Sequence, residues 1–401
     1  NVNNLFHSNL NLLNVVLPIG ISFYTFQIIS YEIDVYNKKV NVQSNILKYF
    51  LYVFLFPQLI AGPIVRYQDV NNEIDNRNVT FEMFANGLRR FIIGLSKKVI
   101  IANNLGELCN IYLNLGDKSV LFTWIFAISY MLQIYFDFSG YSDIAIGLGK
   151  MLGFNFPENF NYPYMAKSIT DFWRRWHMTL GAWFKDYVFY SISLSKAFMK
   201  LSKKTREKFN AFFATLIPTS IAMLAVWFGT GIWHGASWKY VMYGIYYCLI
   251  MILGLLTEPL FKKLYEKMHV NREGKIYKAL QVVRTFIFVN IGMLMFRADD
   301  LKIFGQMLVS MFRNFTFSVL TSGDLFEVKL DVYDFLLLAF GALVLLLVGL
   351  YQEKGHHIRE EIATKNIVLR WVLYYGLIFS VIILGAYGSG YEVAGFIYAQ
   401  F

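Results

Sequence analysis

The stretch Trp227-Phe228-Gly229-Thr230-Gly231-Ile232-Trp233-His234-Gly235-Ala236-Ser237-Trp238 joins two long apolar segments and decides the fold. These segments, at 210–230 and 238–257, each have about the ~20 residues that an α-helix needs to cross a bilayer. An ionisable side chain between two spans is costly unless it faces a cavity, takes part in chemistry or is hydrogen-bonded. The stretch therefore predicts a membrane hairpin. His234 becomes the first candidate active-site residue, with a purely structural histidine as the alternative.

The composition of the whole chain agrees with a membrane protein. Of its 401 residues, 56% are hydrophobic and only 16% are charged. We expect at least eight spans, and no Gly/Ser-rich or Pro-rich linker divides them. The prediction is an all-α, polytopic helical bundle that forms one domain over 1–401. The apolar segments lie at 13–31, 46–64, 119–138, 210–230, 238–257, 278–296, 332–350 and 368–388.

Three further segments are amphipathic rather than uniformly apolar. In 82–102, apolar residues recur at helical spacing while Arg and Lys occupy the rest of the surface. The segments 171–190 and 301–315 have a similar pattern. We expect these segments to form helices that lie in the membrane interface or dip back into the bundle.

The basic residues predict an orientation. The formal net charge is +10, but Lys and Arg gather in loops, above all 196–208 and 262–284. The positive-inside rule places both loops in the cytoplasm, so anionic lipids rather than nucleic acid are the expected partners of this charge. The turn 231–237 then points away from the cytoplasmic loops. The two cysteines are far apart and in apolar surroundings, so we expect neither a disulfide nor a metal site.

A second candidate site lies in the WRRWH stretch. Trp173, Arg174, Arg175, Trp176 and His177 place two guanidinium groups and an imidazole among aromatic rings. Arginines can grip the phosphates of a ligand while aromatic faces cover its apolar or ring portions. The alternative is an interfacial helix whose arginines meet lipid phosphates.

Two carboxylates precede this stretch at the end of an apolar span. Asp137 and Asp143 belong to the segment YFDFSGYSDIAIG at 135–147, in which Ser139 and Asp143 share one helical face. These carboxylates could orient a histidine, or pair with Arg174 or Arg175 as part of a binding site. Structural ion pairing is the favoured role.

Four motifs in this order closely resemble the membrane-bound O-acyltransferase superfamily, specifically its alginate O-acetyltransferase branch. They are LPIGISFYTFQ at 17–27, YFDFSGYSDIAIG at 135–147, WRRWH at 173–177 and GIWHGASW at 231–238. Further similarity at 56–64 and 396–401 extends the resemblance over nearly the whole chain. Because the family usually has hydrophobic helices before the first motif, the resemblance implies that this chain lacks such N-terminal helices.

The resemblance also implies a function and roles for the residues. Such proteins sit in the bacterial cytoplasmic membrane and take an acyl group from a cytosolic thioester, here presumed to be acetyl-CoA, with no bound cofactor. They deliver it across the membrane toward a polysaccharide hydroxyl, commonly with an extracytoplasmic acetyltransferase partner. By motif position, His234 is the general base and His177 orients donor or substrate. Arg174 and Arg175 would hold donor phosphates, and the indole of Trp233 or Trp238 would stabilise the oxyanion.

Other functions stay open at the level of the sequence. Within the enzyme class, a teichoic acid D-alanyltransferase has a similar histidine helix and a late WHG histidine. Outside it, a lipid or sugar permease would not require both histidine motifs, and a scaffold subunit would require neither. Two departures from the family pattern, Tyr190-Ser191-Ile192-Ser193-Leu194-Ser195 and Ile232, weaken any assignment of the particular polysaccharide.

Overall fold

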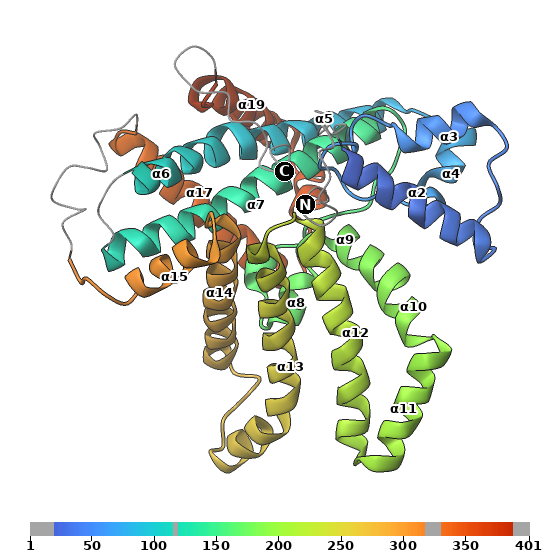
Figure 1. Cartoon of the computed structure of the whole chain (residues 1–401). Helices are drawn as coiled ribbons and strands as arrows, with labels where there is room; N and C mark the ends of the chain where they lie inside the picture. The colour runs from blue at the N-terminus through green and yellow to red at the C-terminus, as the bar shows by residue number, and fades with distance from the viewer. Residues whose placement is uncertain (1–19, 115–118, 317–329, 388–401) are drawn as a thin grey trace, which may run out of the picture.

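The structure, a computed structural model, describes residues 20–114, 119–316 and 330–387. All regular secondary structure in these residues is helical (Figure 1). Six of the described helices are long and apolar enough to span a membrane. They are α7 (Val120–Met151), α12 (Ala211–Trp233), α13 (Trp238–Lys267), α14 (Lys275–Arg297), α17 (Val332–Gln352) and α19 (Ile367–Leu384). The predicted all-α polytopic membrane bundle is confirmed.

The remaining helices are shorter and connect or cover the spans. They are α2 (Ile21–Tyr36), α3 (Ile46–Val53), α4 (Tyr67–Asp75), α5 (Phe81–Ser96), η1 (Lys97–Ala102), α6 (Asn103–Asn114), η2 (Pro163–Met165), α8 (Ile169–Trp173), α9 (Met178–Trp183), η3 (Phe184–Phe189), α10 (Tyr190–Ser193), α11 (Lys196–Lys208), α15 (Leu301–Ser310) and α18 (Ile358–Ala363). Of these, η1 and η3 are π-helices and η2 is a 3₁₀-helix.

Two of the eight predicted spans differ in the structure. The segment 13–31 begins outside the described residues, and its described part belongs to α2, which begins at Ile21. The predicted span 46–64 is wrong, because α3 ends at Val53 and the chain continues through turns. Pro57 and Pro63 have no N–H group to donate to a helical ladder, and two such losses within seven residues disfavour one continuous helix here.

The predicted hairpin around His234 is present. The side chain of Asn210 accepts a hydrogen bond from the N–H of Phe213 and so caps the start of α12. The backbones of α12 and α13 approach closely, since a Cβ on Gly244 would lie 2.2 Å from the carbonyl oxygen of Trp227. Small residues allow such contacts between membrane helices. The turn that carries His234 lies in the middle of the molecule, whereas α11 and the α13–α14 connection share one end (Figure 1).

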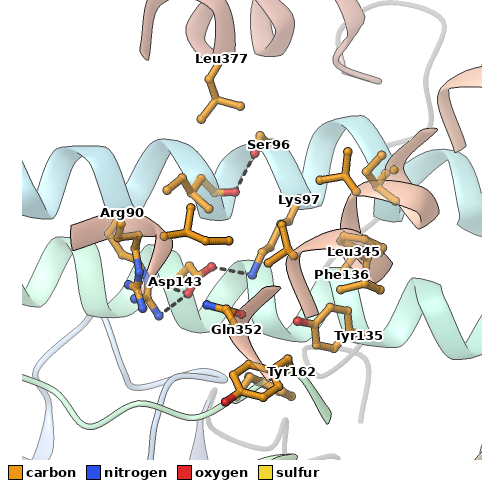
Figure 2. A pocket seen from close by; sticks show the side chains of 18 of the residues that line it. Arg90, Ser96, Lys97, Tyr135, Phe136, Asp143, Tyr162, Leu345, Gln352 and Leu377 are labelled. Carbon is orange, nitrogen blue, oxygen red and sulfur yellow. Dashed lines mark hydrogen bonds and ion pairs between the residues drawn. The ribbon is translucent and has the colours of Figure 1, made fainter. Parts of the chain in front are cut away.

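The amphipathic segment 82–102 dips into the bundle as α5 and η1, which pack along α7. Glycines face each other at two levels: Gly87 meets Gly147, and Gly94 meets Gly140, so that an added Cβ at any of these four positions would lie within 3 Å of the opposite backbone. This close approach lets basic side chains of α5 and η1 reach the carboxylates of α7 (Figure 2).

The segment 171–190 is not the single helix that its pattern predicts. It is divided into α8, α9, η3 and α10, with a break at 174–177 where His177 has a left-handed backbone (φ 45°). The loop before it runs alongside this break: the N–H of Asn161 donates to the carbonyl of Arg175, and the N–H of Met178 donates to that of Asn159 (both 2.9 Å). These bonds satisfy backbone groups that the helix ends leave open.

Candidate active site

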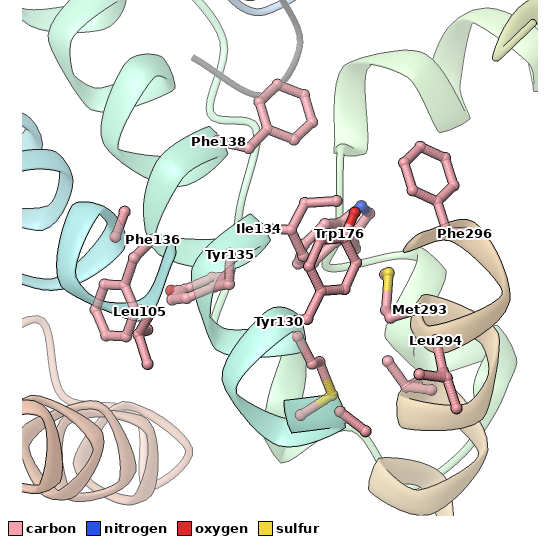
Figure 3. Packing of buried hydrophobic residues seen from close by; sticks show 14 of the residues in the cluster. Leu105, Tyr130, Ile134, Tyr135, Phe136, Phe138, Trp176, Met293, Leu294 and Phe296 are labelled. Carbon is pink, nitrogen blue, oxygen red and sulfur yellow. The ribbon is translucent and has the colours of Figure 1, made fainter. Parts of the chain in front are cut away.

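The two candidate histidines lie in one aromatic core. His177 comes from the break between α8 and α9, and His234 comes from the C-terminal end of α12. Both are buried, with 2% and 9% of their surface exposed. Side chains of α7 and α14, among them Phe138 and Phe296, meet around Trp176 in this core (Figure 3).

Trp233 connects the two histidines. Its ring centroid lies 4.6 Å from that of His234 and 6.1 Å from that of His177. The indole Nε1 of Trp233 is buried and has no hydrogen-bond partner among the described residues. A buried donor without a partner is costly, and it is suited to an acceptor that arrives with a ligand.

His177 is held by a polar anchor. Its Nδ1 lies 3.0 Å from Oδ1 of Asn159, and the same oxygen accepts hydrogen bonds from the backbone N–H (3.3 Å) and the hydroxyl (2.9 Å) of Thr179. Because a backbone N–H can only donate, this atom of Asn159 is the amide oxygen, and Nδ1 of His177 must donate to it. In the neutral imidazole the lone pair is then on Nε2.

The surroundings of His177 favour the neutral form. Burial lowers the pKa of His177 well below its ordinary value, and the neighbouring His234 lowers it further. The ring of Phe138 packs edge-on against His177 at 4.7 Å. A neutral imidazole that is oriented by a hydrogen bond can accept a proton.

His234 is surrounded mainly by aromatic rings. Besides Trp233, the rings of Phe296 and Tyr243 lie edge-on at 5.0 and 5.9 Å. Trp238, the other indole considered as an oxyanion donor, is 75% exposed. The structure therefore separates the two candidates, and only Trp233 lies beside both histidines.

The two arginines of the WRRWH stretch differ in exposure and in their ion pairs. Arg174 is exposed, at the end of α8. Arg175 binds Asp171 (2.9 Å) and Glu353 (2.8 Å). Burial alone would raise the pKa of Glu353, but hydrogen bonds from Arg175 and Lys167 hold it below its ordinary value. Arg175 thus ties the break before His177 to the end of α17, while Arg174 lies at the surface.

The tryptophans of this stretch differ as well. Trp176 is 2% exposed and packs on Phe172 and Phe160, at 5.5 and 5.1 Å, as part of the core. Trp173 packs on Trp227 of α12 at 4.9 Å, and its buried Nε1 has no partner among the described residues. Trp176 supports the break that carries His177, and Trp173 connects α8 to the hairpin.

Asp137 and Asp143 form ion pairs, which is the role that the sequence favours for them, but their partners differ from those suggested. Asp137 binds Lys98 at 2.5 Å. Asp143 binds Arg90 (2.6 Å) and Lys97 (2.7 Å), and Lys97 also reaches Ser139, as the shared helical face predicts. The suggested pairing with Arg174 or Arg175 is wrong, because η1 and α5 place their own cations against α7.

Sequence reasoning missed Asn159. It lies in the segment Phe156-Pro157-Glu158-Asn159-Phe160-Asn161-Tyr162-Pro163, and it is fully buried. A short polar side chain between prolines and aromatic residues, shortly before WRRWH, was a signal that this loop passes through the core. Its partner could not be read from the sequence, since the contact depends on the break at His177.

The described residues form a helical bundle with candidate membrane spans and two histidines in a buried aromatic core, which is an integral membrane protein with a candidate active site. The chain matches the membrane-bound O-acyltransferase family over residues 22–297, and it belongs to this family. The names of its relatives in this family refer to different polymers.

The chain is 38% identical to the probable alginate O-acetylase AlgI of Pseudomonas aeruginosa, over 75% of this chain and 52% of the relative. It is 32% identical to the peptidoglycan O-acetyltransferase of Helicobacter pylori, over 75% and 58%. It is 30% identical to the teichoic acid D-alanyltransferase of Bacillus subtilis, over 71% and 69%. The chain therefore spans a little over half the length of the O-acetylases that it resembles.

Proposed function

We propose that this protein is an O-acetyltransferase of the bacterial cytoplasmic membrane that passes an acetyl group from a cytosolic thioester, acetyl-CoA, toward an exported polysaccharide. The observation that carries the proposal is the meeting of His177 and His234 around Trp233. The O-acetylases and the peptidoglycan O-acetyltransferase among its relatives support acetyl as the transferred group.

In the proposed reaction, an acceptor hydroxyl attacks the thioester carbonyl. His234 accepts the hydroxyl proton as a C–O bond forms, and the carbonyl oxygen becomes an oxyanion near the indole N–H of Trp233. Collapse of this intermediate breaks the C–S bond and releases the thiol, which takes up the proton. His177, with its lone pair on Nε2, orients the donor or the acceptor from the other side of Trp233.

The remaining expectations concern the partners. The exposed Arg174 is the group best placed to bind a donor phosphate, with Arg175, Trp173 and Trp176 supporting the break that presents it. An extracytoplasmic acetyltransferase would complete transfer to the polysaccharide. The rings around His234 exclude water and so protect the thioester from hydrolysis.

The donor decides between the two relevant enzyme functions. Membranes that contain the protein are incubated with labelled acetyl-CoA or with labelled D-alanyl carrier protein, with His234→Ala membranes as the control. We expect acetyl transfer that depends on His234. Transfer of D-alanine instead of acetyl would assign the protein to the teichoic acid D-alanyltransferases.

A further inference from the structure

A cavity of about 820 Å³ lies between α5, η1 and α7 on one wall and α17 and α19 on the other (Figure 2). Of the six candidate spans, α17 and α19 are the two with the smallest buried share. These two helices therefore face mostly outward, toward the surroundings of the bundle, where a bilayer supplies hydrocarbon chains rather than water.

One end of the cavity is polar. It is lined by the cationic side chains of Arg90, Lys97 and Arg359 and the anionic ones of Asp143 and Glu158, so cations outnumber anions there. Asp143 holds Arg90 and Lys97, while Glu158 holds Arg90 at 2.6 Å and Arg359 at 3.5 Å. Arg359 is the least constrained of the three cations, with 56% of its side chain exposed. A ligand with an anionic group can therefore bind here without breaking the pairs of Asp143.

The other end is apolar. Its walls include Leu337, Phe340 and Val344 of α17 and Leu384 of α19. From Leu337 to Gln352, α17 rises by about 22 Å at 1.5 Å per residue. The lining thus changes from hydrocarbon to charge along a distance comparable with one hydrocarbon chain, which is the pattern of an amphipathic ligand.

The polar end lies on the side of the molecule that the basic loops predict to be cytoplasmic. Gln352 lines it, and the neighbouring Glu353 binds Lys167 and Arg175. The carbonyl of Lys167 accepts a hydrogen bond from Arg284 (3.0 Å), which belongs to the basic segment 262–284. The cytoplasmic leaflet is where anionic phospholipids attract basic side chains.

We propose that this cavity binds an anionic phospholipid, with its phosphate at Arg359 and Lys97 and an acyl chain between α17 and α19. The lipid closes the wall of the bundle behind the histidine core. The two are in contact: Phe160 lines the cavity and packs on Phe138 at 5.0 Å, Phe138 contacts His177, and Met178, which follows His177 in the chain, also lines the cavity. The site is therefore separate from, but adjacent to, the candidate active site.

The test measures binding, independently of any transfer activity. The full chain is purified in detergent, and retention of added phosphatidylglycerol or phosphatidylcholine with identical chains is measured by native mass spectrometry. We expect phosphatidylglycerol to be retained preferentially. Arg359→Gln should weaken phosphatidylglycerol binding by about tenfold or more, as for a lost hydrogen bond to a charged group, and should reduce its preference over phosphatidylcholine.

Two substitutions fill the apolar slot, and each has a matched control. Val344→Trp on α17 and Leu384→Trp on α19 should abolish retention. Leu343→Trp and Ile383→Trp should not, because these neighbours are exposed (50% and 74%) and do not line the cavity. Unfolding temperatures without added lipid identify any variant that fails to fold. In that case the slot-filling variant on the other helix tests the proposal.

Three results would overturn the proposal. Equal retention of both lipids by the wild type would show that the site does not select an anionic headgroup. Normal phosphatidylglycerol retention in both slot-filling variants would place the lipid elsewhere. Displacement of the bound lipid by acetyl-CoA would make the cavity a passage for the donor.

Discussion

The histidine core and the seam between α5, η1 and α7 both bury ionisable groups in a membrane bundle, but they satisfy them differently. In the seam, Lys98 faces Asp137, and Asp143 faces two cations, so each charge has an opposite charge within 3 Å. In the core, His177 and His234 lie among rings, and the indole N–H of Trp233 has no partner in the described residues. Paired charges fix helices in place. Neutral imidazoles beside an indole N–H that has no partner among the described residues are suited to a reaction.

The largest expected effect is on the stability of the seam. Lys98→Met leaves Asp137 buried beside an apolar side chain, and loss of one partner of a buried ion pair costs about 3 to 5 kcal/mol. The double variant Lys98→Met/Asp137→Leu should recover most of this loss. The free energy of unfolding of each variant is measured in detergent. A double variant as unstable as Lys98→Met would contradict the role of the seam as a set of paired charges.

The next largest effect is on transfer by the core. His234→Ala and His234→Gln should lower acyl transfer by at least ~10²-fold, the lower value for loss of a general base, with the unfolding temperature retained. His177→Ala should cost less if it orients the donor or acceptor. Near wild-type transfer by folded His234→Ala protein would make this histidine structural, like the seam residues.

Arg174 offers a smaller effect that separates donor binding from lipid contact. If its guanidinium binds a donor phosphate, Arg174→Gln should weaken donor binding by about 1.5 to 3 kcal/mol. Equilibrium binding of acetyl-CoA to purified protein measures this effect. Arg175→Gln, in contrast, should also lower stability, because it leaves Glu353 with only Lys167. Unchanged donor affinity in both variants would favour the alternative, in which the arginines of WRRWH contact lipid phosphates at the membrane interface.

The smallest effect concerns the tautomer of His177. In Asn159→Asp, a carboxylate would face Nδ1–H, and a nearby opposite charge raises the pKa of an imidazole by about one unit or more. The neutral imidazole would then be lost at a higher pH, so the acidic limb of the transfer profile should move upward. Thr179→Val, which removes the hydroxyl donor to Asn159 and the acceptor of the Ile64 N–H but adds no charge, is the control. An unmoved profile in Asn159→Asp would contradict the assigned hydrogen bond.

The sequence by itself determined the membrane class, six of the eight spans that it predicted, the His234 hairpin and the family, because apolar length, charge in loops and motif order are properties of the linear chain. It could not predict that 46–64 turns after Val53, or that WRRWH breaks at His177, because a loop from before the motif takes the backbone hydrogen bonds there. It also predicted ion pairs for Asp137 and Asp143 but not their partners.

Only the tertiary structure brought His177 and His234 to the same tryptophan and separated both from the seam. The physical reason is that a membrane bundle must satisfy each buried polar group internally. The sequence contains many residues that could serve as partner to each group, and only the packing of the helices selects one. Glycine contacts along α5 and α7 set which cations reach which carboxylates. Asn159 and the α12–α13 turn set where the two imidazoles meet.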